Sequence, residues 1–209
     1  MTKIILTYGD SNTHGTPPIR KRGVVERYDA KTRWPKIMQS DLGHDWELIE
    51  EGLPGRTTSH TDPVMGPHMN GQIGLRIALQ SHGPIDQLVI MMGTNDLKAH
   101  FGLTAAGVTA GVAGLLAIAK SDEYQTRHGG FDVLLVCPPS VIETGSMSDV
   151  FYGAAAKSVE LPALYGALAA HWNVGFLDAG AHINPSHIDG VHFDADAHTT
   201  LGHAVAAAL

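Results

Sequence analysis

The chain has 209 residues, 44% of them hydrophobic, and a formal net charge of −7 at pH 7. This length supports one substantial hydrophobic core, so we expect a single domain over residues 1–209. The negative charge disfavours nucleic acid, which binds basic patches, and it disfavours anionic membrane surfaces. The one cysteine, Cys137, cannot form an internal disulfide and fits a reducing compartment.

Two apolar stretches bear on targeting and membranes. The run from Ile4 to Tyr8 is too short for a secretory leader and is soon followed by Asp10, so we expect a cytoplasmic protein. Residues 101–119 carry no charge, a length at which a membrane span is worth considering. Four glycines and many alanines make this stretch only weakly hydrophobic, however. We expect it to pack as a helix against a sheet or a partner subunit.

Short apolar runs alternate with stretches of helical spacing along the whole chain. Strands are predicted at 4–8, 46–50, 88–92, 131–137 and 174–177. Helices are predicted at 34–42, which Gly43 ends; around Ile73, Ile77 and Leu79; within 101–119, with Val108, Val112 and Leu115 as one stripe; around 161–168; and from Ala195 onward, with Leu201 and Val205 facing inward. Strands that are each followed by a helix are typical of a parallel sheet covered on both faces. The sequence therefore predicts a three-layer α/β/α sandwich with a five-stranded parallel sheet.

Three common uses of such a sheet lack their motifs. No G-x-G-x-x-G is present, which disfavours a dinucleotide site of the usual type. No Gly-Lys pair is present, so there is no phosphate-binding loop that ends in G-K-[ST]. The G-x-S-x-G turn of the α/β-hydrolases is also missing.

Three residues follow predicted strands at the points where those strands end. They are Ser11 after the first strand, Gly55 after the second and Asn95 after the third. The carboxyl ends of parallel strands meet at one edge of the sheet, where α/β proteins bind ligands, so we expect these residues to lie close together. Taken alone, Gly9-Asp10-Ser11 is more typical of an ordinary turn that ends in a helix cap than of a catalytic site.

Asp189 and His192 stand three residues apart near the end of the chain. A serine hydroxyl is a weak nucleophile at neutral pH, so acyl transfer needs an imidazole to take its proton and a carboxylate to orient the imidazole. The spacing allows Asp189 to contact His192 within one local turn. The N–H groups of Ser11 and Gly55 and the side-chain amide of Asn95 would supply donors for the tetrahedral oxyanion.

Four blocks of the sequence resemble those of the SGNH hydrolases, also called the GDSL esterase/lipase superfamily. They are Gly9-Asp10-Ser11, Gly55, Gly93-Thr94-Asn95-Asp96 and Asp189-x-x-His192, and their order and spacing match over nearly the whole chain. Flanking residues further resemble a branch of bacterial arylesterases and acyltransferases: Glu50-Glu51-Gly52-Leu53, Arg56-Thr57-Thr58 and Asp189-Gly190-x-His192-Phe193. The chain departs from the pattern at Asn12, where the GDSL motif has leucine, and at Glu50, where many relatives have asparagine. Neither departure touches a triad position.

The resemblance implies a flavodoxin-like sheet and hydrolysis of carboxylic esters with short acyl groups, with acyltransferase activity as an accompanying reaction. It implies a small-molecule ester as the substrate, no cofactor and no metal. It assigns Ser11, Asp189 and His192 to a catalytic triad, and Ser11, Gly55 and Asn95 to the oxyanion hole. The resembled branch also forms homo-oligomers, up to octamers.

Two other functions stay open at this point. A metal-dependent hydrolase would use the histidines and aspartates that crowd near the C-terminus, although their spacing matches no recognised ligand motif. These residues are His182, His187, Asp189, His192, Asp194, His198 and His203. The other alternative is a non-catalytic binding protein on a hydrolase fold, because a fold does not fix a function.

Several polar residues near these blocks are also expected to have structural roles. Asp96 reads best as a helix start, because aspartate caps helices well. Asp10 and Asp178 read as hydrogen-bond acceptors that organise loops. Arg56 is equally consistent with a contact to substrate and with a solvated side chain.

The segment between Pro138 and Lys157 has more apolar residues than a solvated loop normally carries. It follows the fourth strand, so it is expected at the same sheet edge as Ser11. The apolar residues predict a surface buried by self-association, with a wall of the acyl pocket as the alternative. They are Val141, Ile142, Met147, Val150, Phe151 and Tyr152.

Overall fold

The computed structural model describes residues 2–209 and contains a five-stranded sheet in which every neighbouring pair is parallel. The strand order is β2-β1-β3-β4-β5. The strands are β1 (Lys3–Gly9), β2 (Trp46–Gly52), β3 (Gln87–Met91), β4 (Asp132–Cys137) and β5 (Gly175–Asp178).

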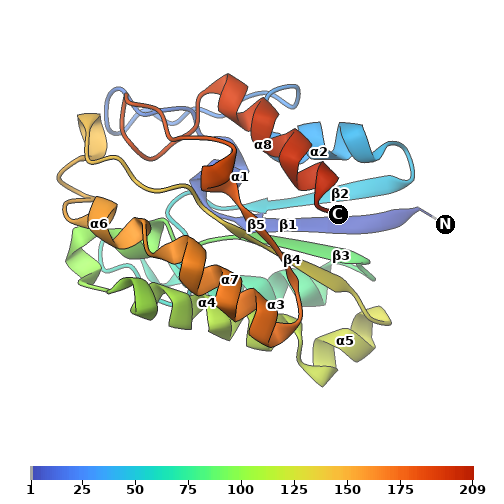
Figure 1. The fold of residues 1–209 in the computed structure, drawn as a ribbon. Coiled ribbons are helices and arrows are strands. Elements are labelled where there is room, and N and C mark those ends of the chain that lie inside the picture. Colours follow the sequence, from blue (N-terminus) through green and yellow to red (C-terminus); the bar gives the residue numbers. More distant parts are fainter. Residues whose placement is uncertain (1) are drawn as a thin grey trace.

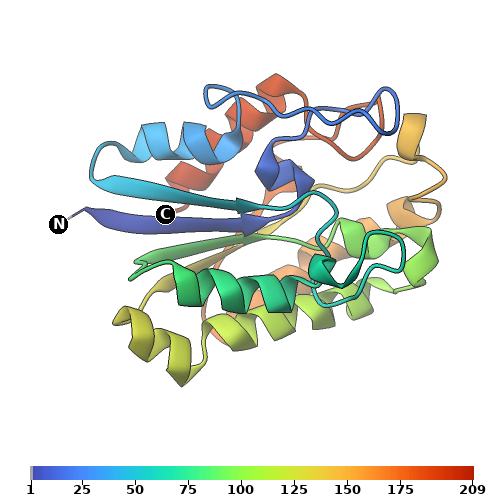
Figure 2. The ribbon, with the colours of Figure 1, turned by 180° about the vertical axis from the view of Figure 1, so that it is seen from behind.

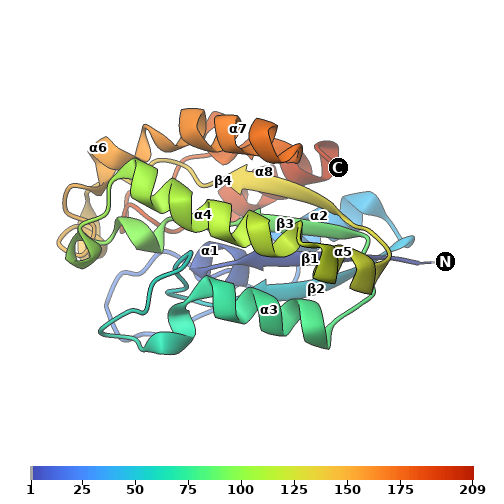
Figure 3. The same cartoon turned by 90° about the horizontal axis from the view of Figure 1, so that it is seen from below.

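Helices cover both faces of this sheet. Figure 1 shows α2 and α8 together on one face and α3, α4 and α7 on the other. Figure 3 shows the last three side by side, with α4 in the middle. The helices are α1 (Ser11–His14), α2 (Trp34–Leu42), α3 (Gly71–Ser81), α4 (Ala105–Ala119), α5 (Asp122–His128), α6 (Ala154–Ser158), α7 (Leu161–Trp172) and α8 (Ala195–Ala207).

The sandwich has two hydrophobic cores, one on each side of the sheet. Successive side chains of a strand point to opposite faces. In β1, Ile5 therefore joins the core under α2 and α8, and Leu6 joins the core under α3, α4 and α7. Both side chains are fully buried, as is β3 along its whole length. The apolar runs of the sequence thus form central strands because both of their faces need cover.

The strand order reverses direction at β1. β2 pairs with one side of β1, and β3 pairs with its other side. In parallel sheets a crevice for ligands opens at this reversal, outside the carboxyl ends of the strands. Figures 1 and 2 show the loops that follow the strands gathered at this end of the molecule. The fold places Ser11, the second residue after β1, at the crevice.

The predicted three-layer α/β/α fold with five parallel strands is confirmed, and so is the flavodoxin-like strand order. The strand bounds differ from the expected ones by one or two residues, as at β5. The uncharged stretch becomes a short turn followed by α4, which contacts α3 and α7 of its own chain. Within residues 2–209, none of the helices combines the length and the apolar character needed to cross a bilayer.

The helix predicted around Ile73, Ile77 and Leu79 is α3, and only one of these three side chains is buried. Ile73 and Ile77 are 50% and 62% exposed, whereas Leu79 is fully buried. Positions four apart share a face of a helix. The face with Ile73 and Ile77 points to solvent, because Leu75 and Ala78 fill the space against the sheet.

The segment from Pro138 to Lys157 is not the free apolar surface that its composition suggested. Val141 and Phe151 are 4% and 2% exposed and belong to the core of their own chain. Of the large apolar side chains in this segment, Tyr152 is the one that stands in solvent, at 75% exposure. The apolar residues of this segment thus serve mainly to pack it onto the molecule.

Candidate active site

Ser11 stands on a tight turn between β1 and α1. The Asp10 carboxylate caps α1 by accepting a hydrogen bond of 2.9 Å from the Asn12 N–H. The first residue of a helix has no intrahelical acceptor for its own N–H, so the Ser11 backbone N–H is available to a ligand. The Asn12 side chain donates to the Val191 carbonyl over 3.1 Å and ties this turn to the C-terminal segment.

The structure brings Ser11, His192 and Asp189 into one hydrogen-bonded series. Ser11 Oγ lies 3.0 Å from His192 Nε2, and His192 Nδ1 lies 2.7 Å from Asp189 Oδ2. All three residues are buried, with Ser11 7% exposed at the floor of a cavity. The short distance to Asp189 fixes the proton on Nδ1, which leaves Nε2 as the nitrogen that can accept the serine proton.

The turn from Asp189 to His192 depends on Gly190. Its φ is +77°, a conformation that side chains rarely allow. A Cβ there would also lie 1.7 Å from the Ile142 carbonyl oxygen. Glycine therefore lets the chain reverse tightly enough for the Asp189 carboxylate to meet the imidazole three residues later.

The Asp189 carboxylate accepts four hydrogen bonds. Oδ1 accepts from the N–H groups of Val191 and His192, and Oδ2 accepts from the His192 ring. The fourth donor is the Ile19 N–H, 2.6 Å from Oδ2, on a loop that follows α1. Burial alone raises the pKa of Asp189, but the hydrogen bonds and charge of His192 outweigh burial and hold the pKa below its usual value. Asp189 is therefore ionised at neutral pH.

Gly55 and Asn95 lie beside Ser11 around the same cavity. Gly55 has a φ of +89°, and a Cβ on it would meet Met65 Sδ at 2.5 Å, so its backbone faces the cavity without a side chain in the way. The Asn95 side-chain amide donates one hydrogen to Asp10 Oδ2 over 3.2 Å. Its second N–H remains for a ligand.

Asp10 is a buried carboxylate directly behind this site. Burial raises its pKa to about 6, although the Asn12 N–H and the nearby His192 act in the opposite direction. In its ionised form it accepts from Asn95 and so orients the Asn95 amide. Asp10 organises the turn before α1, as expected, through the Asn12 N–H. It also contacts the Asn95 side chain, which the sequence did not predict.

The cavity over Ser11 is small and mostly apolar, with a volume of about 160 Å³. Lys98 is the charged residue in its wall, and its ammonium group donates to Asp62 Oδ2 over 3.1 Å. Asp62 also accepts from the Met65 N–H and so holds the loop that covers Gly55. The cavity is lined by Ser11, Thr16, Ile19, Pro54, Gly55, Met65, Asn95, Lys98, Met147, Phe151, Val191 and His192.

Two neighbouring polar residues have contacts that the sequence did not predict. Asp96 stands in the first turn of a short 3-10 helix (Asn95–Leu97), as expected of a helix start, but its fully buried carboxylate does not cap that helix. It accepts from the backbone N–H and the hydroxyl of Thr58 instead. It thereby ties the loop after Gly55 to the loop that carries Asn95. Arg56 neither lines the cavity nor lies in solvent. It is buried over the Tyr8 ring and donates to the Gly9 carbonyl, which also accepts from the Leu53 N–H.

The two departures from the family pattern have structural contacts of their own. Glu50 lies on β2 and forms a two-pronged pair with Arg33, with N···O distances of 2.9 Å. Asn12 makes the bridge to Val191 described above. Asp178 accepts from the Gly180 N–H and organises the turn after β5, as expected.

The histidines near the C-terminus are dispersed. His198 is buried against Trp34, whose N–H lies 3.4 Å from its Nδ1, and His203 pairs with Asp41 on the surface. Within residues 2–209, no three histidine, cysteine or acidic side chains gather in a way that could hold a metal ion. The metal-dependent alternative therefore has no candidate ligand set in this part of the chain.

We expect His198 to make the protein less stable in acid. Burial, and then the charges of His192 and Arg33, lower its pKa from 6.5 to about 4. The unfolded chain binds this proton below about pH 6.5 and the folded chain only below about pH 4, so stability falls as the pH falls between these values. The contribution is about 3 kcal/mol. Denaturant unfolding of wild type and His198→Phe at pH 7 and pH 4.5 measures it.

The wild-type curve alone is not informative, because the raised pKa of Asp10 acts in the opposite direction in the same range. The difference between the two proteins isolates His198. His198→Phe should lose less stability on acidification than wild type. Equal losses in both proteins would show that folded His198 takes up a proton as readily as the unfolded chain.

Sequence reasoning did not find Ile19, Lys98 or Met65. Ile19 contacts Asp189 through its backbone N–H. The type of residue does not reveal such a contact, because every residue except proline has this group. Lys98 follows the Asn95 block by three residues, and a lysine at that distance reads as solvated until its pairing with Asp62 is seen. The apolar wall residue Phe151 was noticed in the sequence but assigned first to a subunit interface.

A hydroxyl, an imidazole and a carboxylate in hydrogen-bonded series, at the carboxyl edge of a parallel sheet, is the arrangement found in serine hydrolases. The comparison with protein families agrees. The chain belongs to the GDSL-like lipase/acylhydrolase family, whose model matches residues 7–201. The resemblance noted in the sequence is thus confirmed.

Solved structures of similar proteins extend this result. A carbohydrate acetylesterase from Sinorhizobium meliloti is 36% identical, with 99% of this chain and 97% of that chain covered at a TM-score of 0.93. An aryl esterase from M. smegmatis is also 36% identical, with the same coverage and a TM-score of 0.92. A lipase/acylhydrolase from Enterococcus faecalis, 19% identical over 99% of this chain and 94% of that chain, has a TM-score of 0.66 and shows the shared fold alone. The comparison with curated protein sequences finds no match.

Proposed function

We propose that this protein is a serine-dependent carboxylester hydrolase that works through an acyl-enzyme on Ser11. The observation that carries the proposal is the series Ser11 Oγ, His192 Nε2, His192 Nδ1 and Asp189 Oδ2, with distances of 3.0 and 2.7 Å. Membership of an acylhydrolase family and the likeness to an aryl esterase and a carbohydrate acetylesterase support it.

In the first half of the reaction, His192 Nε2 takes the Ser11 proton as Oγ attacks the ester carbonyl carbon. Negative charge develops on the carbonyl oxygen and is met by the N–H groups of Ser11 and Gly55 and the Asn95 amide. The imidazolium, stabilised by ionised Asp189, then gives its proton to the departing alkoxide. The products of this half are the free alcohol and the Ser11 acyl ester.

In the second half, His192 takes a proton from water, whose oxygen attacks the acyl carbon. Collapse of the second tetrahedral intermediate returns the proton to Ser11 Oγ and releases the acid. An alcohol can take the place of this water and give a new ester. The proposal therefore includes acyl transfer, which product analysis in water–alcohol mixtures measures.

One assay tests the proposed function. Wild type should hydrolyse 4-nitrophenyl acetate, a serine-directed organophosphate should stop the reaction, and a chelator should have no effect. Mass spectrometry should find the organophosphate on the peptide that contains Ser11. Loss of activity on chelation would favour a metal-dependent hydrolase, and absence of hydrolysis with an intact fold would favour a binding protein.

The size of the cavity supports short acyl groups. A volume of about 160 Å³ equals roughly five water-sized groups of ~30 Å³ each. This is room for an acetyl to butanoyl chain. The apolar wall next to Ser11 suits such a chain better than a polar alcohol.

Met147→Ala is expected to widen this limit. Met147 lines the cavity and is only partly buried, so its truncation removes a wall with less damage to the core than truncation of buried Phe151. The ratio of kcat/KM for 4-nitrophenyl octanoate to that for the acetate should rise by about tenfold or more. An unchanged ratio would show that another wall sets the limit.

We also propose that the chain forms homo-oligomers. Exposed apolar side chains on soluble proteins tend to mark interfaces, and Ile73 and Ile77 stand one turn apart on the solvent face of α3. Light scattering should give a mass above one chain of 22.2 kDa, and Ile77→Asp should lower it. A wild type that is monomeric at micromolar concentration would end this proposal.

A further inference from the structure

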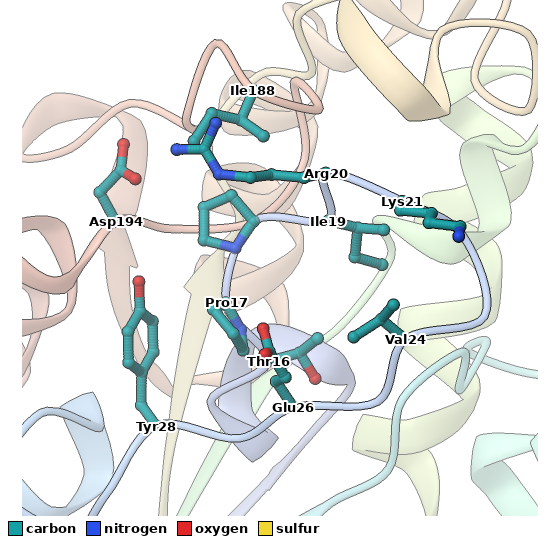
Figure 4. Close-up of a pocket in the computed structure, with 11 residues that line it drawn as sticks. Thr16, Pro17, Ile19, Arg20, Lys21, Val24, Glu26, Tyr28, Ile188 and Asp194 are labelled. Carbon is teal, nitrogen blue, oxygen red and sulfur yellow. The ribbon is translucent and has the colours of Figure 1, made fainter.

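A second cavity, of about 360 Å³, lies next to the one over Ser11 (Figure 4). We call it the loop cavity, because residues 16–28 form most of its wall, and Ile188 and Asp194 close it from the C-terminal segment. Thr16 and Ile19 line both cavities. The two spaces are therefore neighbours that share a wall.

That shared wall is anchored to the candidate triad. The Ile19 N–H donates to Asp189 Oδ2, and the Ile19 carbonyl accepts from the Ser146 hydroxyl. Further along the same loop, the Tyr28 N–H donates to the Gly15 carbonyl over 2.8 Å. The loop that forms the cavity is thus held at several points around the reaction centre.

The position that the leaving group must take beside His192 indicates which cavity would hold which part of an ester. The departing alkoxide must lie within hydrogen-bond reach of His192 Nε2, which protonates it. The segment that carries His192 also supplies Ile188 and Asp194 to the loop cavity. An acyl chain placed in the apolar cavity beside Gly55 and Asn95 leaves the alcohol part directed to this side.

The loop cavity has unused hydrogen-bonding groups. Within residues 2–209, the side chains of Arg20, Lys21, Glu26 and Asp194 form no ion pair, and neither they nor the Tyr28 hydroxyl form a hydrogen bond with another residue. Figure 4 shows the Tyr28 hydroxyl directed toward Asp194, and Arg20 extending toward Ile188. Burial, and then the charge of Asp194, raise the pKa of Tyr28. These groups would donate to and accept from a bound ligand.

The charges and apolar surfaces of the loop cavity indicate which class of ligand it fits. Two cations and two carboxylates cancel in charge, which favours a neutral ligand over an ionic one. The Tyr28 ring, fixed edge-on against His198 at 5.3 Å, adds an apolar surface, as do Pro17 and Pro18. A ligand that combines several hydroxyl groups with C–H faces fits such a mixed wall.

We propose that the loop cavity binds the alcohol part of the ester and that this alcohol is a neutral polyhydroxylated compound, such as a sugar. The inference rests on the proposed function, since an alcohol part exists only for an ester substrate. Tyr28 and Asp194 are then specificity-determining residues. They contact the leaving group and take no part in proton transfer.

The test compares two acetate esters that differ only in the alcohol: methyl 6-O-acetyl-glucopyranoside and ethyl acetate. Tyr28→Phe should lower the ratio of kcat/KM for the sugar ester to that for ethyl acetate by about fivefold, the effect of one neutral hydrogen bond. Asp194→Ala should lower this ratio by about tenfold or more, because a charged acceptor is lost. Tyr152→Phe is the matched control, since Tyr152 is an exposed tyrosine that lines neither cavity, and it should leave the ratio unchanged.

A second arm measures binding without turnover. Isothermal titration of the Ser11→Ala variant with methyl 6-O-acetyl-glucopyranoside should show binding that Tyr28→Phe weakens about fivefold in the same background. If wild type hydrolyses ethyl acetate but the ratio does not respond to Tyr28 or Asp194, the alcohol site is wrong and the esterase stands. If wild type hydrolyses neither of these esters and does not hydrolyse 4-nitrophenyl acetate either, the proposed function fails. The calorimetric titration then tests by itself whether the loop cavity binds the sugar ester, and absence of binding would contradict the proposed alcohol site.

Discussion

Ser11→Ala and His192→Ala are each expected to reduce kcat for an aryl acetate by about 10⁴-fold or more, without loss of the fold. Ser11 Oγ is the atom proposed to attack the carbonyl, and His192 Nε2, 3.0 Å away, is the proposed acceptor of its proton. Neither step proceeds without both atoms. The double variant should therefore be hardly slower than either single variant, because the two groups act as a unit.

The measurement is single-turnover and steady-state kinetics on all four proteins, with circular dichroism and thermal unfolding as checks of the fold. Tyr152→Phe again serves as a control away from the site. Losses that add in the double variant would contradict the triad, because additive losses mean independent roles. All three variants should still hydrolyse the ester faster than water does without enzyme, because the oxyanion donors remain in place. A rate equal to that of uncatalysed hydrolysis would mean that these donors contribute nothing.

Asn95→Ala is expected to lower kcat by roughly 10²–10³-fold with little change in KM. The Asn95 amide is held in place by Asp10 Oδ2 at 3.2 Å, so its free N–H is fixed before the substrate binds. Charge on the carbonyl oxygen develops only in the transition state, and a donor aimed at it therefore acts on kcat. Kinetics with ethyl acetate and 4-nitrophenyl acetate should give the same loss.

Asn95→Asp is the companion variant, because it keeps the size of the side chain and removes the donor. It should be at least as slow as Asn95→Ala, since a carboxylate repels the developing oxyanion. A rise in KM at constant kcat in either variant would instead make Asn95 a binding or structural residue.

Much of the fold follows from the spacing of apolar residues. The strands with continuous β-branched and leucine runs, such as β1 and β3, were located within one or two residues, because only a central strand needs apolar side chains on both faces. α3 shows the limit of the method. Ile73, Ile77 and Leu79 all fit a helical period, and only the packed structure shows which of these side chains the sheet covers.

The candidate site divides in the same way. Ser11, Asn95, Asp189 and His192 could be found because their chemistry requires particular side chains at particular strand ends. The Ile19 N–H, the pairing of Lys98 with Asp62 and the burial of Arg56 could not be found. These contacts join residues far apart in the chain, and a backbone N–H is present at every position except proline.

The origin of the three candidate catalytic groups has a consequence for folding. Asp189 and His192 meet across a single turn, but Ser11 and His192 are separated by 181 positions in the chain. Closing a loop over such a separation costs conformational entropy, so we expect it late in folding, after local contacts have formed that offset this cost. During refolding, hydrolytic activity should therefore return no earlier than the packing of α8 beside α2. The recovery of enzyme activity would then report the completion of the native state. It should follow the recovery of helix content measured by circular dichroism.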